Sequence, residues 1–200
     1  MTAKSFYYDF PGKRLYLDCD CDSIEGRLVE ASAIKNPMYG DTLENVTVRN
    51  IAFQHSNLAS FSRGGAINIS GKNVTLDNLD VSYMDTVAII LGGVGVTLSN
   101  SRVSYSGSVG VAGRGTGFKI VRNRLFKNNL RGFNKWWEAG GIKFVGGGGI
   151  TNSEISGNTV IGSTADGIWL DTGNPGNIIR DNLVIGNTGM GIHIDRKSVV

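Results

Sequence analysis

The sequence predicts an all-β protein that folds as a single-stranded, right-handed parallel β-helix of about six turns with an N-terminal β-hairpin cap. The first observation is a phrase that recurs three times, as Gly-Ile-Lys-Phe-Val at 141–145, Gly-Ile-Trp-Leu-Asp at 167–171 and Gly-Ile-His-Ile-Asp at 191–195. The copies begin 26 and 24 residues apart. Repeats of this period are typical of stacked units, which share a continuous core because no unit buries its apolar face alone.

The second observation is a series of short β-branched segments that end in asparagine. The asparagines are Asn50, Asn78, Asn100, Asn123, Asn158 and Asn182. Alternating β-branched residues followed by Asn and Gly predict a strand and then a tight turn. We expect one asparagine at the same bend of each turn, where it tolerates a left-handed backbone and joins a side-chain ladder. The expected architecture is a pectate-lyase-like solenoid.

The first 40 residues differ from the repeats. Residues 5–17 predict two aromatic-rich strands joined by a turn at Pro11 and Gly12, a hairpin that caps the N-terminal end of the stack. We therefore expect a cap segment over 1–40 and β-helix repeats over 41–200, within one domain. No comparable cap follows Asp195. We expect either an exposed last turn, which favours a homodimer through that end, or a longer natural protein.

Composition and charge argue against several classes. A formal net charge of +3 without a run of Lys or Arg disfavours nucleic acid as a partner. No apolar stretch is long enough to span a membrane, and residues 1–5 contain no apolar signal-peptide core. The sequence does not predict a cellular location for this chain, and we expect full-length natural relatives to be exported. A bridge between Cys19 and Cys21 is strained at this spacing, and no metal site is completed nearby, so we expect reduced thiols.

Strand alternation predicts which side chains of the repeated phrase leave the core. The inward positions are Ile142, Phe144, Ile168, Leu170, Ile192 and Ile194. Lys143, Trp169 and His193 then form one outward column, and Asp171 and Asp195 form another. Trp169 is expected to offer a flat apolar face to a sugar ring.

The predicted column of Asp171 and Asp195 points to chemistry. Because neighbouring strands lie roughly 4.8 Å apart, we expect the two carboxyl groups on the order of 5 Å apart. Retaining glycosidases hold two carboxyl groups about 5–5.5 Å apart, one as nucleophile and one as acid/base. The alternative is that both residues are solvated turn residues at strand ends.

The longest spacing between the asparagines contains an insertion at 128–141. It carries Trp136, Trp137 and Glu138 and leads directly into the first copy of the repeated phrase. Long loops in compact repeats tend to carry function, so we expect these side chains beside the outward column. The alternative is that both tryptophans cap the side of the β-helix. Arg114 is expected to be a turn residue.

Three segments resemble a group of bacterial right-handed parallel β-helix proteins: Trp-Glu-Ala-Gly-Gly-Ile-Lys at 137–143, and the phrases at 167–171 and 191–195. The nearest group with an assigned chemistry is the β-helix β-xylosidases of glycoside hydrolase family 120. The resemblance implies that Asp171 is the nucleophile. It places Asp195, one methylene shorter, at the position of the acid/base glutamate. Residues 196–198 read Arg-Lys-Ser where that family has Asn-His-Gly.

The leading expectation is a carbohydrate-active domain that hydrolyses a glycosidic bond by a retaining two-carboxylate mechanism, without a cofactor. Its partner is then an oligo- or polysaccharide. The residues expected to bind the sugar are Trp136, Trp137, Glu138, Lys143, Trp169 and His193. A second hypothesis is a polysaccharide lyase with Lys143 as base and Glu138 holding Ca²⁺ against a substrate carboxylate. A third is a non-catalytic glycan-binding or structural repeat module.

Overall fold

The computed structural model describes residues 5–18, 23, 25–26, 28–58, 64–145 and 149–195. The chain divides into two compact units, Met1–Ser32 and Ala33–Val200. Cys19 and Cys21, with the thiols expected there, lie outside the described residues.

The N-terminal unit contains the predicted hairpin. Strands β1 (Ser5–Asp9) and β2 (Arg14–Asp18) pair antiparallel. Pro11 and Gly12 lie in the turn between them, where the fixed φ of proline favours chain reversal. The hairpin is confirmed, and its role as a cap stays a prediction.

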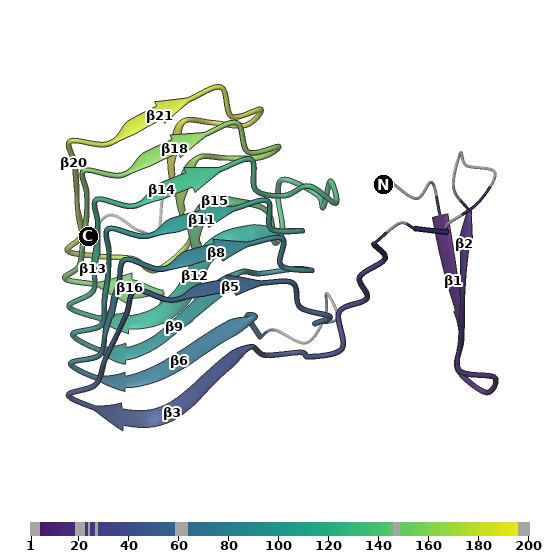
Figure 1. The fold of residues 1–200 in the computed structure, drawn as a ribbon. Coiled ribbons are helices and arrows are strands. Elements are labelled where there is room, and N and C mark those ends of the chain that lie inside the picture. Colours follow the sequence, from purple (N-terminus) through teal and green to yellow (C-terminus); the bar gives the residue numbers. More distant parts are fainter. Residues whose placement is uncertain are drawn as a thin grey trace. The chain divides into compact units, whose positions relative to one another are not determined.

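The second unit is a right-handed parallel β-helix, which confirms the predicted fold class (Figure 1). Three parallel sheets run along it, and successive turns add strands to each. The first sheet contains β4 (Thr47–Arg49), β7 (Thr75–Asp77), β10 (Thr97–Ser99), β13 (Lys119–Val121), β17 (Glu154–Ser156) and β20 (Ile178–Arg180). The second contains β5 (Ala52–Gln54), β8 (Asp80–Ser82), β11 (Arg102–Ser104), β14 (Arg124–Phe126), β18 (Thr159–Ile161) and β21 (Leu183–Ile185).

The third sheet has the longest strands and carries the repeated phrase. Its strands are β3 (Met38–Glu44), β6 (Ile67–Lys72), β9 (Ile89–Val94), β12 (Val109–Thr116), β15 (Gly140–Phe144), β19 (Ile168–Leu170) and β22 (Ile192–Ile194). The short strand β16 (Ile150–Thr151) pairs with the end of β12. Within the described part of the chain, no helix is long and apolar enough to cross a membrane.

The core lies between the three sheets and consists mostly of aliphatic side chains stacked in columns. One column of the first sheet contains Leu76, Leu98, Ile120 and Ile155, each fully shielded from solvent. Burial of one such side chain contributes on the order of 1.5–3 kcal/mol. Because each layer is covered by the next, stability comes from the stack more than from any single turn.

The first three bends of the first sheet hold asparagine as predicted. Asn50, Asn78 and Asn100 have φ values of 60°, 50° and 50°, in the left-handed region that asparagine tolerates. The side-chain amide of Asn78 donates to Oδ1 of Asn50 at 2.9 Å. The Asn100 amide donates instead to Oδ1 of Asp77 at 2.6 Å, so among these three residues the expected asparagine ladder joins only Asn50 and Asn78.

The later asparagines occupy a different position, which corrects the prediction of one equivalent asparagine per turn. Register places Arg122, not Asn123, after β13 at the left-handed bend, with φ 56°. The backbone N–H of Asn123 donates to Oδ1 of Asn158, and that of Asn158 to Oδ1 of Asn182, both at 2.9 Å. This second ladder is internal. It arises because buried backbone N–H groups at the corner need an acceptor.

The predicted inward positions of the repeated phrase are buried except in the last described turn. The inward residues of β15 and β19, Ile142, Phe144, Ile168 and Leu170, are at most 3% exposed. Ile192 and Ile194 share columns with Ile168 and Leu170 but are 47% and 50% exposed. Their predicted burial is wrong. Among the described strands of this sheet only β19 pairs with β22, so no described strand covers its other edge.

Candidate functional site

Three neighbouring strands of the third sheet bring the outward column together. β15 pairs with β19 and β19 with β22, so that Lys143 lies opposite Trp169, and Trp169 opposite His193. Strand alternation turns these side chains away from the core. The register therefore confirms the column predicted from the repeated phrase.

Trp169 lies between its two neighbours in this column. The Nζ atom of Lys143 is 3.5 Å from the centroid of the indole ring. The imidazole of His193 stacks on the ring with centroids 4.6 Å apart and planes 11° apart. Both neighbours, together with Trp136 at the ring edge, leave Trp169 only 5% exposed. The expectation that Trp169 offers an open face to a sugar is corrected, because cation–π and ring stacking contacts occupy the ring.

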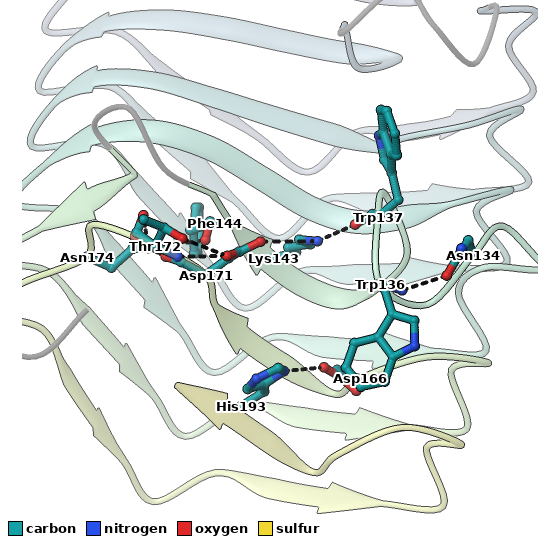
Figure 2. A network of polar contacts seen from close by, with 10 residues as sticks. All are labelled: Asn134, Trp136, Trp137, Lys143, Phe144, Asp166, Asp171, Thr172, Asn174 and His193. Atoms are coloured by element: carbon teal, nitrogen blue, oxygen red, sulfur yellow. Dashed lines mark hydrogen bonds and ion pairs between the residues drawn. The ribbon is translucent and has the colours of Figure 1, made fainter. Parts of the chain in front are cut away.

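Asp171 follows β19 and points toward Lys143 (Figure 2). Its Oδ2 atom lies 3.6 Å from Nζ of Lys143. Its Oδ1 atom accepts hydrogen bonds from the backbone N–H of Thr172 at 2.8 Å and from the Thr172 hydroxyl at 3.1 Å. One carboxylate oxygen is thus fixed by the chain, and the other faces a cation.

Lys143 is a buried cation held by several groups. Its ammonium also donates to the backbone carbonyl of Trp137, which ties the insertion to the sheet. Burial lowers the pKa of Lys143, and the nearby carboxylates of Asp171, Asp166 and Glu138 oppose this shift. The charged amine is therefore less favoured here than in water.

The insertion forms a wall beside this column, as predicted. Asn129 anchors it: its side-chain amide donates to the carbonyls of Phe133 at 3.0 Å and Thr164 at 3.1 Å, and its Oδ1 accepts from the Phe133 N–H at 2.9 Å. Trp136 and Trp137 follow, and they are 57% and 61% exposed. These two rings, unlike Trp169, present accessible apolar surface.

A cavity of about 680 Å³ lies over the third sheet next to this wall. Its lining includes Trp136, Trp137, Glu138, Lys143 and Asp171. Its floor extends over β9 and β12, toward the N-terminal turns. Five of the predicted site residues therefore meet in one cavity.

The other predicted residues do not line this cavity. Trp169 is covered, and His193 and Asp195 lie one turn further along the stack, beyond the lining residues. The N–H of Asp195 donates to the carbonyl of Leu170 at 3.0 Å, so Asp195 does follow Asp171 in the same column. The separation expected between the two carboxyl groups stays a prediction.

Comparison with known families agrees with the fold. A family model described as "Right handed beta helix region" matches residues 65–200. The chain belongs to this right-handed β-helix family. No curated protein matches the chain. The β-helix fold is compatible with a carbohydrate-active domain, and the choice among hydrolysis, elimination and binding alone rests on the site.

Asp166 is a site residue of this β-helix that sequence reasoning missed. It precedes the second copy of the repeated phrase and is 2% exposed. Its Oδ2 lies 2.9 Å from Nδ1 of His193, and its Oδ1 accepts from the Met190 N–H at 2.7 Å. Asp166 thus positions the imidazole that stacks on Trp169. Its position directly before the repeated phrase that begins at Gly167 was the sequence signal that could have identified it.

Arg114 was also missed, because the sequence placed it in a turn. It lies within β12, and it lines the cavity. Glycines on both sides made the segment resemble a bend, but an added Cβ at Gly113 would lie 2.2 Å from the Leu91 carbonyl oxygen. The close approach of the neighbouring strand therefore explains this glycine within a strand.

The site combines two carboxylates, two cations and two exposed indoles on one cavity. Such a set supports binding of a polar ligand with apolar ring faces and transfer of a proton. Across the described ranges, no group of three His, Cys, Asp or Glu side chains is placed to hold a metal ion.

Proposed function

We propose that this β-helix binds a glycan in the cavity and hydrolyses a glycosidic bond with retention of configuration. The observation that carries the proposal is the position of Asp171. It lines the same cavity as the two exposed tryptophans, with its carboxylate held between Thr172 and Lys143. Stacking on indole rings is a general way to bind the apolar face of a sugar.

Asp171 is the proposed nucleophile. Hydrogen bonds from Thr172 to Oδ1 fix the carboxylate, and the ammonium of Lys143 lies 3.6 Å from Oδ2. A carboxylate oxygen attacks the anomeric carbon while the leaving oxygen takes a proton from the acid. Water then attacks the glycosyl ester and gives up its proton to the acid/base residue, which lost its own proton in the first step. This releases Asp171.

Two residues compete for the acid/base role. Asp195 follows Asp171 by one turn in the same column, at the position that the family resemblance assigns to the acid. Glu138 belongs to the insertion and lines the cavity, which Asp195 does not. The lining of the cavity therefore favours Glu138 as the acid/base, whereas the strand register favours Asp195.

Replacement of the proposed nucleophile tests the function. A panel of oligo- and polysaccharides, with mass analysis of the products, identifies the substrate for the wild type. Asp171→Asn is then expected to reduce turnover of that glycan to background, because an amide cannot form the glycosyl ester. Asp181→Asn, at an exposed aspartate in the bend after β20, serves as the matched control. Turnover at the wild-type rate in Asp171→Asn contradicts the proposal.

A specific observation also favours elimination as a second candidate. Burial lowers the pKa of Lys143, which raises the share of neutral amine available as a base. In that reaction the amine removes the proton next to a uronate carboxylate, and the glycosidic oxygen leaves to give an unsaturated sugar. Ultraviolet absorbance of that product when formed by the wild type, together with its loss in Lys143→Arg, supports the lyase. Loss of the same absorbance when a chelator is added supports the Ca²⁺ expected for that reaction. Saturated products exclude it, and binding without any product selects the non-catalytic module.

A further inference from the structure

The floor of the cavity carries a cation that the proposed hydrolysis does not use. Arg114 lies on β12 opposite Gly92 of β9. Ala112, two residues before Arg114, lies opposite Lys143 of β15. Since side chains two apart share one face of a strand, Arg114 emerges on the same face as Lys143. Register thus places both cations along one cavity.

Three of the residues next to Arg114 are glycines. Its chain neighbours Gly113 and Gly115 have no side chains, and neither does Gly92 on the next strand. The residue is exposed, and the ion pairs found among the described residues do not include it. Lys143, by contrast, is held by Asp171 and by the carbonyl of Trp137. Arg114 is therefore the cavity cation whose charge is available to a ligand.

We propose that Arg114 binds the carboxylate of an acidic sugar, so that the cavity takes glycans containing uronate residues. A guanidinium matches a planar carboxylate with two parallel hydrogen bonds, which a neutral hydroxymethyl group cannot replace. The strand that carries Arg114 lies two positions from the strand that precedes Asp171, roughly 10 Å along the stack. The uronate therefore lies beside the sugar at the cleavage point, not on it.

The inference rests on the part of the proposed function that places a glycan in the cavity, and binding of monosaccharides tests it without any cleavage. The probes are D-glucuronate against D-glucose and D-galacturonate against D-galactose, titrated at low ionic strength because salt screens an exposed charge pair. The variants are Arg114→Gln, which removes the charge, and Arg114→Lys, which keeps a point charge without the fork. Arg124→Gln, at an exposed arginine in β14 of the second sheet, is the control.

The wild type is expected to bind each uronate about tenfold more tightly than its neutral partner. Arg114→Gln should abolish this preference, Arg114→Lys should keep part of it, and Arg124→Gln should match the wild type. Thermal unfolding of each variant at the wild-type temperature shows that the fold is intact. Equal binding of acidic and neutral sugars by the wild type, or a preference that survives in Arg114→Gln, overturns the inference.

The two proposals fail separately. If a neutral glycan is cleaved by the wild type and not by Asp171→Asn, while uronates gain no affinity, Arg114 has lost its assigned role and the hydrolase stands. If uronates bind through Arg114 while Asp171→Asn cleaves at the wild-type rate, the nucleophile is wrong and the acidic-sugar site stands.

Discussion

Lys143 links the candidate nucleophile, the buried indole and the insertion at the scale of single residues. Its ammonium lies 3.6 Å from Oδ2 of Asp171 and 3.5 Å from the centroid of Trp169, and it donates to the carbonyl of Trp137. Such an ammonium exchanges water for a carboxylate, an aromatic face and a carbonyl. One charged side chain therefore contacts both the wall and Asp171.

The buried amine predicts a pH dependence of stability. Because the pKa of Lys143 in the folded protein lies below its ordinary value of 10.5, the unfolded chain binds more protons between these two values. The free energy of unfolding of the wild type should therefore rise with pH across that window, relative to Lys143→Met, in which this site does not titrate. Urea unfolding of both proteins at a series of alkaline pH values measures the difference. A difference that is flat or falls with pH contradicts the buried, partly compensated cation.

The acid/base residue is also a question for single residues. Loss of the acid should slow cleavage of glycosides with poor leaving groups by about 10²–10⁴-fold. Aryl glycosides with acidic leaving groups should be much less affected, because their leaving oxygen needs no proton. Steady-state kinetics of Glu138→Gln and Asp195→Asn on both kinds of substrate assigns the role. Equal, small effects in both variants would show that neither residue is the acid.

At the scale of elements, the insertion between β14 and β15 turns a plain sheet face into a cavity. It depends on Asn129, which is fully buried with φ 67° and makes three hydrogen bonds to the Phe133 backbone and the Thr164 carbonyl. The loop therefore has its own folded base before it reaches Trp136. This base holds the indoles beside β15 and β19 without a regular element in the insertion itself.

Loosening this base should separate the wall from the sheet. Asn129→Ala is expected to destabilise the protein by about 1–3 kcal/mol, because buried backbone groups lose their partner. It should also weaken glycan binding. Asn129→Gly, which accepts the positive φ but cannot form the hydrogen bonds, separates backbone strain from anchoring. Denaturant unfolding and glycan titration measure both effects. Full affinity in both variants would show that the wall does not contribute to binding.

Across the whole molecule, the sequence period predicted the stacked strands and their outward columns, and it missed features that do not recur from turn to turn. Alternation correctly placed Lys143, Trp169 and His193 in one column, because a strand has two faces and the phrases stack in register. It could not show that Trp169 is covered, since covering comes from the partners in that column and a non-periodic insertion. It also placed Arg114 in a turn, because glycines required by close strand packing resemble turn glycines.

The asparagine ladders show the same limit of periodic reasoning at the corners. The step from Asn100 to Asn123 is one residue longer than the step from Asn78 to Asn100. That single residue moves the side chain from the outer bend to the buried corner. Asparagine suits both positions. At the outer bend it tolerates a left-handed backbone, and at the buried corner its side-chain oxygen accepts a backbone hydrogen bond. The residue type alone therefore could not distinguish the two positions.

In the proposed reaction, Asp171 attacks a sugar from the cavity face of the β-helix. Trapping tests it most directly, with an activated 2-deoxy-2-fluoro glycoside of the sugar that the glycan screen identifies. The fluorine slows hydrolysis of the glycosyl ester, so the covalent intermediate accumulates. Peptide mass analysis should then find one sugar attached at Asp171. A sugar attached to another carboxylate, or turnover of the glycan by a protein that is never labelled, would contradict the assignment of Asp171 as nucleophile.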